Sequence, residues 1–221
     1  MTDDIVTRLL RLDCCAVSDA LDKLGQPAAV TGLPPRSVPR KIAGKVHTVK
    51  LVAKADAPPA TGAPRHLGTT AIEVSAPGEI IVVEQRTGID AGCWGGILSL
   101  GAKMRGIAGV IADGPLRDVD EAREFDFPVY SRSVTARTAR NRVAELATDL
   151  PIQIGEVTVQ PGDYAIADST GICFLPAAHA AAIVAEAETI AMREAAMGKA
   201  LLAGKRITEV MGANYEKMLE R

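Results

Sequence analysis

The sequence predicts an α/β fold, and two patterns lead to this prediction. The first is a parallel βαβ unit: an apolar run at 80–83, a glycine-rich loop, a helix to Arg105 and a second apolar run at 110–112 follow in that order. Such a crossover is right-handed and makes its two strands parallel. The second is an alanine-rich stretch, Ala178 to Ala203, which predicts a long C-terminal helix stopped by Gly204.

The composition is that of a globular protein with a sizeable core. At 221 residues the chain fits one large or two small domains, and 48% of its residues are apolar. No apolar run reaches the roughly 20 residues that a membrane helix needs. The N-terminal segment is acidic and its apolar stretch is interrupted, so it is not expected to be a signal peptide. We therefore expect a soluble, cytoplasmic protein with no membrane partner.

The charge balance gives no case for a nucleic-acid partner. The formal net charge is -2, and aromatic residues, which would stack on bases, make up only 3% of the chain. One local group of arginines follows several acidic residues, so we interpret it as a solvated face or a subunit contact. Its members are Arg132, Arg137, Arg140 and Arg142.

The four cysteines lack the C-x-x-C spacing of a redox or zinc motif. Cys14 and Cys15 are adjacent and could hardly bridge to each other, so reduced thiols are expected. Cys93 lies next to the candidate site described below, but no histidine is near it in the sequence. A thiol mechanism is therefore not expected.

The remaining elements follow along the chain. Apolar spacing over 3–24 predicts two helices, with Ser18 and Asp19 as a possible start of the second and Gly25 as its stop. Alternation over 42–52 predicts a strand.

The proline-rich stretch 54–70 predicts a loop near an opening, from which Arg65 and His66 could reach a ligand. After Asp118 a short helix to Phe125 is expected. Further β structure is predicted at 127–131, 152–159 and 164–175.

A candidate site follows from the βαβ unit. Parallel strands have their carboxyl ends on one edge of a sheet, so the turn at 95–96 and the turn at 114–118 should emerge near each other, where ligands are favoured. The first turn offers backbone amides at a helix start, which suit a carboxylate or a phosphate. The second offers the Arg117 guanidinium and the Asp118 carboxylate, which suit an acidic ligand and a divalent cation.

Each of these residues also has a plainer interpretation. Asp118 and Glu121 have the spacing of a capping box, so the Asp118 carboxylate can serve only to cap the helix that follows. A single arginine such as Arg117 more often makes a surface ion pair than a ligand contact. Glycines in a βα turn are needed for its geometry whether or not anything binds. The convergence of the two turns is what favours a functional site.

Glu194 interrupts the apolar stripe of the long C-terminal helix. A carboxylate on such a face needs a partner. On these residues alone, an ion pair across a subunit contact ranks ahead of catalysis, and both remain open. The rest of the stripe is Ile183, Ala187, Ile190, Met197 and Leu201.

The run from Trp94 to Glu121, W-G-G-I-L-S-L-G-A-K-M-R-G-I-A-G-V-I-A-D-G-P-L-R-D-V-D-E, resembles the signature of the 4-hydroxy-4-methyl-2-oxoglutarate aldolase family. That family also contains the regulator of ribonuclease activity A proteins. The specific part is G-x-x-R-D after a short strand, and the resemblance covers nearly the whole chain. The other matching segments are 18–21, 42–44, 127–129 and 161–163.

The resemblance implies a layered β/β/α swivelling-domain fold and one aldolase-like domain over 1–221. Its parts would be N-terminal helices at 1–30, a β/β/α core at 40–176 and a C-terminal helical extension at 177–221. It also implies a homotrimer, or a hexamer of two stacked trimers, with the sites between subunits.

The resemblance also assigns a role to each candidate residue. Asp118 would hold Mg²⁺ or Mn²⁺, largely through water, and Arg117 would bind the carboxylate and carbonyl end of a 2-oxo acid. A glutamate on the C-terminal helix of one subunit would reach the active site of its neighbour, and Glu194 is the candidate match. The residues that would complete the substrate cradle are Gly95, Gly96, Ile97 and Leu98.

The implied reaction is that of a class II, metal-dependent aldolase, in which the cation acts as a Lewis acid. The substrate would be 4-hydroxy-4-methyl-2-oxoglutarate or a related hydroxy-oxo diacid, cleaved to pyruvate and a second oxo acid. Oxaloacetate decarboxylase activity would accompany it. The alternatives are a non-catalytic regulator that binds a ribonuclease, and a family member with another 2-oxo acid substrate.

The sequence departs from the family at Gly96. Many members carry an acid at this position, where it orients metal-bound water. Asp90, Glu84 or Asp113 could take its place, and the sequence alone does not position any of them.

Overall fold

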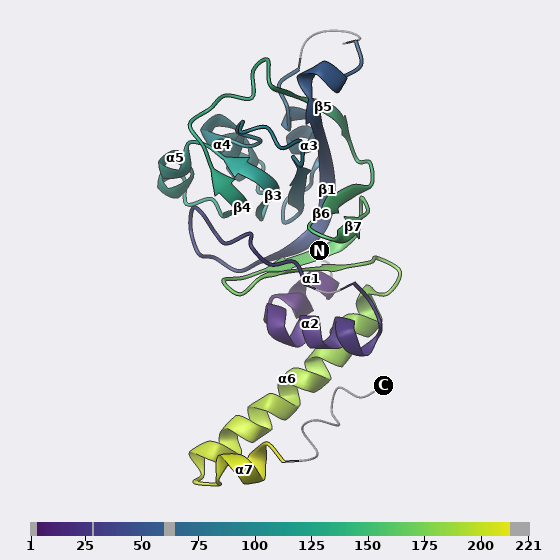
Figure 1. Ribbon diagram of the computed structural model, residues 1–221. Helices are drawn as coiled ribbons and strands as arrows, with labels where there is room; N and C mark the ends of the chain where they lie inside the picture. Colours follow the sequence, from purple (N-terminus) through teal and green to yellow (C-terminus); the bar gives the residue numbers. More distant parts are fainter. Residues whose placement is uncertain (1–3, 28, 60–64, 213–221) are drawn as a thin grey trace.

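The computed structural model describes residues 4–27, 29–59 and 65–212 and has an α/β fold with a mixed sheet and a long C-terminal helix (Figure 1). The sheet and its helices form a rounded body, and the N-terminal and C-terminal helices lie together at one end of it (Figure 1). Parts of the predicted segments 1–30, 54–70 and 177–221 lie outside the described residues. The division of the chain into those parts stays a prediction.

The main sheet is organised around β1 (Ile42–Ala53), which confirms the strand predicted at 42–52. The seven strands lie in the order β4 (Val129–Val134), β3 (Gly109–Leu116), β2 (Ile80–Glu84), β1, β8 (Tyr164–Ala167) and β9 (Ile172–Leu175), with β5 (Val143–Thr148) also paired to β1. The pairs from β1 to β4 are parallel, whereas β5, β8 and β9 pair antiparallel. A separate hairpin joins β6 (Ile152–Ile154) to β7 (Val157–Val159).

The predicted βαβ unit is confirmed. β2 and β3 are parallel, with Val82 opposite Ile111, and α4 (Gly96–Met104) lies between them in the chain. β2 is buried along its whole length, which explains why its sequence is an apolar run and not an alternating pattern. β3 is longer than the predicted 110–112, because it continues through a register shift to Leu116.

The N-terminal helical pair is confirmed as α1 (Asp4–Leu9) and α2 (Cys14–Lys23). The suggested start of α2 at Ser18 or Asp19 is wrong. The helix begins after Asp13, whose carboxylate accepts a hydrogen bond from the Ala16 amide at 2.8 Å. The predicted stop is confirmed, since Gly25 has a φ of 63° just beyond the helix.

The sequence predicted neither α3 (Thr69–Val74) nor β5. α3 has only six residues, and it follows Gly68 in the left-handed conformation without a side-chain cap, so it carries no start signal. In β5 only Val143 is buried, so its sequence shows no clear alternation. The short helix predicted after Asp118 is confirmed as α5 (Val119–Glu124).

The predicted C-terminal helix is confirmed as α6 (Ala180–Leu202), but only its first half is packed. Ile183, Ala187 and Ile190 are fully buried, whereas Met192 is 66% exposed and Leu202 is 91% exposed. Two ion pairs join the packed half to the N-terminal helices, Arg8–Glu188 at 2.7 Å and Lys23–Glu186 at 2.8 Å. The predicted apolar stripe is therefore buried only as far as Ile190 within this chain.

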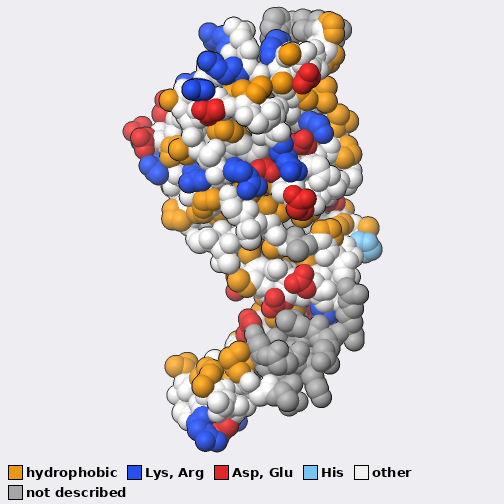
Figure 2. Space-filling model, viewed as in Figure 1, with side chains coloured by type: hydrophobic (Ala, Val, Ile, Leu, Met, Phe, Trp, Pro, Cys, Tyr) orange, Lys and Arg blue, Asp and Glu red, His pale blue; other side chains and the backbone are white. Residues whose placement is uncertain are grey.

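Beyond this point α6 extends away from the body and is followed by α7 (Ile207–Val210) (Figure 1). Hydrophobic side chains gather at this far end, as Figure 2 shows. They include Ile207, which is 54% exposed. None of the helices in the described residues is both long enough and apolar enough to cross a membrane.

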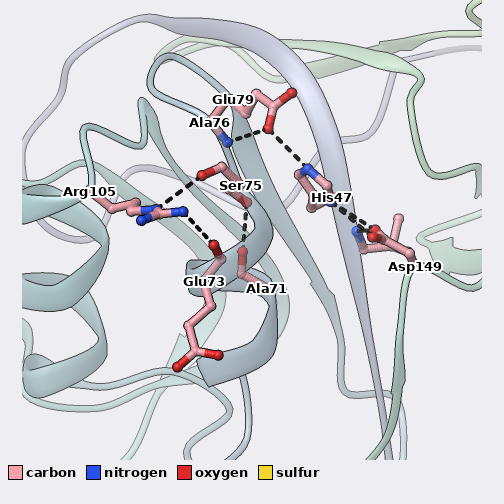
Figure 3. Close-up of polar contacts among 9 residues, drawn as sticks. His47, Ala71, Glu73, Ser75, Ala76, Glu79, Arg105 and Asp149 are labelled. Carbon is pink, nitrogen blue, oxygen red and sulfur yellow. Dashed lines mark hydrogen bonds and ion pairs between the residues drawn. The ribbon is translucent and has the colours of Figure 1, made fainter.

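Polar contacts fix the C-terminal end of α4 and the start of β2 (Figure 3). The Arg105 guanidinium, just after α4, donates to two backbone carbonyls at the end of α3. His47 of β1 lies between two carboxylates: its Nε2 is 2.9 Å from Glu79 and its Nδ1 is 3.0 Å from Asp149. These contacts hold α4 and the turn before β2 in place on the sheet, so the other end of α4 has a fixed position as well.

Gly44→Ala is expected to destabilise the protein. A Cβ at this position of β1 would overlap the carbonyl oxygen of Gly78 and lie 3.1 Å from Ile80 Cγ1, so neighbouring strands would have to move. We expect the free energy of unfolding to fall by about 1–3 kcal/mol, measured by urea denaturation. Gly198→Ala in α6 is the control, because its Cβ would meet nothing within 4 Å. Equal stability of the two variants would contradict this account of Gly44.

Candidate active site

The two turns that were predicted to meet do lie together, and backbone hydrogen bonds join them. The Cys93 amide donates to the Pro115 carbonyl at 2.9 Å, and the Arg117 amide donates to the Trp94 carbonyl at 3.0 Å. These bonds hold the chain just before α4 against the end of β3. Arg117 and Asp118 therefore stand beside the first turn of α4.

Asp118 has a backbone conformation that few residues adopt. Its φ is 56° and its ψ is 43°, in the left-handed region where aspartate is tolerated better than most non-glycine residues. It precedes α5, but its side chain makes no capping hydrogen bond to that helix. Its Oδ2 instead accepts a hydrogen bond from the Gly96 amide at 3.1 Å. The interpretation of Asp118 as only a cap of α5 is therefore wrong.

Arg117 and Asp118 form an ion pair that solvent can reach. Arg117 Nε lies 3.3 Å from Asp118 Oδ2, and the two side chains are 35% and 32% exposed. Within the described residues the two terminal nitrogens of the Arg117 guanidinium have no acceptor. They are the groups that could bind the carboxylate and carbonyl oxygens of an acidic ligand.

Backbone amides of the first turn of α4 face the Arg117–Asp118 ion pair. Gly95 precedes the helix and supplies no side-chain cap, and the amides of Ile97 and Leu98 have no acceptor in the part of the chain that the structure describes. The pocket in front of them has a volume of about 160 Å³, which is small compared with the pockets of drug-sized ligands and suits a small acid. Its lining is His66, Leu67, Gly92, Trp94, Gly95, Gly96, Ile97, Leu98, Arg117, Asp118, Thr138 and Ala139.

A second, more open cavity of about 590 Å³ also includes Arg117 and Asp118. The rest of its lining is the first turn of α5 and the end of β4 with the residues after it, namely Val119, Asp120, Glu121, Val134, Thr135 and Ala136. Arg117 and Asp118 thus line both cavities. A ligand larger than the small pocket can extend into the second cavity without leaving them.

The surroundings of Asp118 fit a divalent cation that is bound largely through water. Its carboxylate is partly exposed and receives one backbone hydrogen bond, so it keeps lone pairs for a cation. Mg²⁺ is often held by one or two protein carboxylates and several waters. Among the described residues no three His, Cys, Asp or Glu side chains are placed to hold a metal together. The described residues therefore provide no closed, all-protein metal cage here.

Glu194 is not part of this pocket within one chain. It lies on the exposed outer half of α6 and lines neither cavity beside Arg117. Partial burial, and then repulsion from the Asp13 and Asp19 carboxylates, raises the pKa of Glu194. The charged groups that shift the pKa of Glu194 are thus carboxylates. Its predicted ion pair and its predicted catalytic role both need a second copy of the chain, and both stay predictions.

The three acids considered as substitutes at Gly96 all lie outside the Arg117 pocket. Glu84 accepts a hydrogen bond from the Gln153 amide at 2.7 Å, and Asp90 pairs with an arginine at 3.4 Å. Asp113 is 4% exposed and receives hydrogen bonds from Arg132 Nε and the Gly155 amide. Asp90 and Asp113 line a different cavity, of about 1020 Å³. None of the three therefore supplies the missing acid within this chain.

Glu121 is the acid that the sequence-based interpretation missed. A Cβ built on Gly96 would overlap Glu121 Oε2 and lie 2.7 Å from Glu121 Cδ. The carboxylate of Glu121 therefore occupies the space that a side chain at position 96 would take. The only sequence signal for it was its spacing from Asp118, which suggested a capping box.

The cysteine nearest to the site is unsuited to nucleophilic chemistry. Cys93 is fully buried, and burial raises the pKa of its thiol to about 12. Its Sγ donates to the Pro115 carbonyl oxygen at 3.2 Å. All four cysteines are free thiols, as predicted.

Comparison with known proteins places these features in a family. The sequence model of the RraA-like family, described as Aldolase/RraA, matches residues 14–174. The chain is 25% identical over 206 residues to Protein DlpA of Legionella pneumophila, and the match covers 93% of this chain and 33% of that protein. The chain thus spans about a third of the length of this relative.

Two further proteins resemble the chain over most of their own length. A protein of Halalkalibacterium halodurans, named "Putative 4-hydroxy-4-methyl-2-oxoglutarate aldolase", is 27% identical over 175 residues, with 78% of this chain and 77% of that protein covered. The crystal structure of Streptomyces coelicolor RraAS2, described as an unusual member of the RNase ES inhibitor RraA protein family, has a TM-score of 0.76 at 25% identity. That match covers 88% of this chain and 95% of the other.

The family match contains the βαβ unit, both turns of the candidate site and most of the sheet. It ends before α6 begins. Because the match covers well over half of the sequence, the chain belongs to the RraA-like family of aldolases and RraA proteins.

Proposed function

We propose that this protein is a divalent-metal-dependent lyase that cleaves a 4-hydroxy-2-oxo diacid of the 4-hydroxy-4-methyl-2-oxoglutarate type to pyruvate and a second oxo acid. Oxaloacetate decarboxylase activity accompanies it. One observation carries the proposal: the Asp118 carboxylate is held against the first amide of α4, beside Arg117, at the mouth of a small pocket. The similarity to a named aldolase of this type supports it.

The residues of the pocket suit a 2-oxo acid. The Arg117 guanidinium carries a full positive charge, and within the described residues its two terminal nitrogens have no acceptor, so they can bind the carboxylate and the adjacent carbonyl oxygen. The amides of Ile97 and Leu98 point from a helix start and bind the same carboxylate without any change in protonation. The substrate is thereby oriented with its carbonyl oxygen toward Asp118.

Mg²⁺ or Mn²⁺ is the cofactor that we propose for Asp118. When bound, the cation supplies positive charge that stabilises the negative charge developing on the 2-oxo oxygen as the carbon–carbon bond breaks. Asp118 fixes the position of this charge through its own constrained backbone and the hydrogen bond from Gly96. No lysine nucleophile is needed in this scheme.

The assembly belongs to the proposal too. We propose a β/β/α swivelling-domain fold and a homotrimer, or a hexamer of two trimers, in which Glu194 reaches the pocket of a neighbouring copy. The exposed outer half of α6, which carries Glu194, supports this arrangement. A cytoplasmic location and the lack of a nucleic-acid partner stay predictions.

The competing function is that of a non-catalytic regulator that binds a ribonuclease. The similarity to a structure described as a member of an RNase inhibitor family favours it. The two functions differ in what they require of Asp118, because a regulator needs no metal-dependent turnover. A third possibility is an enzyme of the same kind with another 2-oxo acid as its substrate.

Removal of the metal is expected to abolish pyruvate release. Purified protein with Mg²⁺ should release pyruvate from oxaloacetate and from 4-hydroxy-4-methyl-2-oxoglutarate, and excess chelator should lower the rate by at least about 100-fold. Pyruvate is measured by coupled oxidation of NADH, with the uncatalysed rate in Mg²⁺ alone subtracted. If neither substrate yields pyruvate, the proposed lyase activity is contradicted, and the non-catalytic regulator becomes the favoured function.

Asp118→Asn and Arg117→Ala are expected to affect different kinetic constants. Asparagine tolerates the same backbone conformation but lacks the charge, so Asp118→Asn should lower kcat by at least about 100-fold. Arg117→Ala should raise KM by about 10- to 100-fold, since it removes charge-assisted hydrogen bonds to the carboxylate. Asp120→Asn is the control, because its side chain is 89% exposed. Wild-type kinetics in both site variants would contradict the assignment.

A further inference from the structure

The small pocket beside Arg117 has few side chains that can exchange a proton with a ligand. Glycines, apolar side chains and one threonine make up most of its lining. Arginine stays protonated in proteins, and the Asp118 carboxylate is engaged by the Gly96 amide and by Arg117. Among the described residues of the lining, the remaining titratable one is His66. Imidazole is the side chain that most readily takes up and gives back a proton near neutral pH.

Local contacts fix the place of His66 at this pocket. Its carbonyl oxygen accepts hydrogen bonds from the amide and the hydroxyl of Thr69, at 3.3 and 2.7 Å. The Gly68 amide donates to a Glu145 carboxylate oxygen at 2.7 Å, and a Cβ on Gly68 would lie only 2.8 Å from the ring of Trp94. The backbone around His66 is therefore held against the buried tryptophan that lines the same pocket.

The His66 ring is available to a ligand. Its side chain is exposed, and within the part of the chain that the structure describes its ring nitrogens have no hydrogen-bond or ion-pair partner. His47 differs in this respect, because both of its ring nitrogens lie beside carboxylates. A ring whose nitrogens are unengaged can accept a proton from a bound substrate and donate it again.

His66 lines both the small pocket and a further cavity of about 730 Å³. Three cationic side chains line this further cavity, namely Lys54, Arg65 and Arg140. The one acid among its described lining residues is Glu145, and both of its carboxylate oxygens accept hydrogen bonds from the chain. The cavity therefore has an excess of positive charge, which suits the second carboxylate of a diacid.

The cavity of about 590 Å³ that also includes Arg117 is a poorer place for that carboxylate. Its lining has three acids, Asp118, Asp120 and Glu121, and one cation. Carboxylates repel each other. We therefore expect a diacid whose 2-oxo acid end is held by Arg117 to direct its other carboxylate past His66. The hydroxyl-bearing C4 atom, which lies between the two ends of the substrate, then comes next to the imidazole.

We propose that His66 is the proton-transfer residue of this site. The proposal rests on the proposed function, from which it takes the substrate. His66 takes the proton of the C4 hydroxyl, the C4–O bond becomes a carbonyl, and the C3–C4 bond breaks with its electron pair forming the enolate of pyruvate. The imidazolium then returns the proton to C3 of the enolate, so pyruvate and the second oxo acid are released and His66 is neutral again.

The first test compares two reactions of the same site in the presence of Mg²⁺. Oxaloacetate has no hydroxyl to deprotonate, and loss of CO₂ from it gives the same enolate. His66→Gln should lower kcat for cleavage of 4-hydroxy-4-methyl-2-oxoglutarate by at least about 100-fold. It should lower the rate of CO₂ release from oxaloacetate by less than about 5-fold, because that reaction needs no base before the bond breaks.

The matched control for this test is His179→Gln. His179 is also an exposed histidine, it precedes α6 without making a side-chain cap, and it lines neither of the two cavities that His66 lines. Both reactions should therefore keep their wild-type rates in this variant.

The second test restores the imidazole from solution. His66→Ala leaves space at the pocket that free imidazole can enter, so added imidazole should raise the cleavage rate of this variant by at least about 10-fold. His66→Gln fills that space and should not respond to imidazole. A structural role of His66 would not give this rescue, and melting temperatures of both variants near the wild-type value would show that the fold is kept.

The outcomes separate this inference from the proposed function. If wild-type protein acts on neither substrate, the proposed function is contradicted, and the role of His66 is contradicted with it. If wild-type protein is active and His66→Gln slows both reactions equally, or slows neither, only the assignment of His66 is overturned. The absence of imidazole rescue in His66→Ala also overturns that assignment and leaves the proposed function in place.

Discussion

The two backbone hydrogen bonds that join residues 93–94 to the end of β3 are the constraint on which the site depends. They fix the first turn of α4 against Arg117 and Asp118. Trp94 strengthens this connection, since its ring is buried and its indole N–H donates to Ser99 Oγ in α4 at 3.1 Å. With the far end of α4 held by Arg105, the helix cannot slide along the sheet. The amides at the start of α4 and the backbone of Arg117 and Asp118 therefore keep their relative positions.

The features that the sequence predicted are those that arise from contiguous residues. The buried strand β2 is an apolar run, and the glycine-rich loop before α4 marks a turn into a helix, so the βαβ unit could be read directly. Once its strands are parallel, the meeting of the two turns follows from topology. Arg117 and Asp118 are adjacent in one short segment, so their convergence with Gly96 needed no knowledge of distant contacts.

The rest depended on partners that lie far apart in the sequence or on backbone angles. Asp113 looked available as a site acid, but Arg132 and Gly155, from β4 and the turn after β6, take both of its oxygens. The capping-box interpretation failed because the left-handed backbone of Asp118 turns its carboxylate toward α4 and not α5. The same geometry places the Glu121 side chain beside Gly96. No rule based on sequence spacing predicts that contact.

The position of Trp94 has a practical consequence for following this protein in solution. It is the only tryptophan in the chain, and it is buried at the floor of the small pocket beside Arg117. All indole emission of the protein therefore comes from this one position. A change in the intensity or wavelength of that emission would report directly on the local environment of the pocket. The measurement needs no added label and uses the protein at the concentrations of ordinary fluorescence experiments.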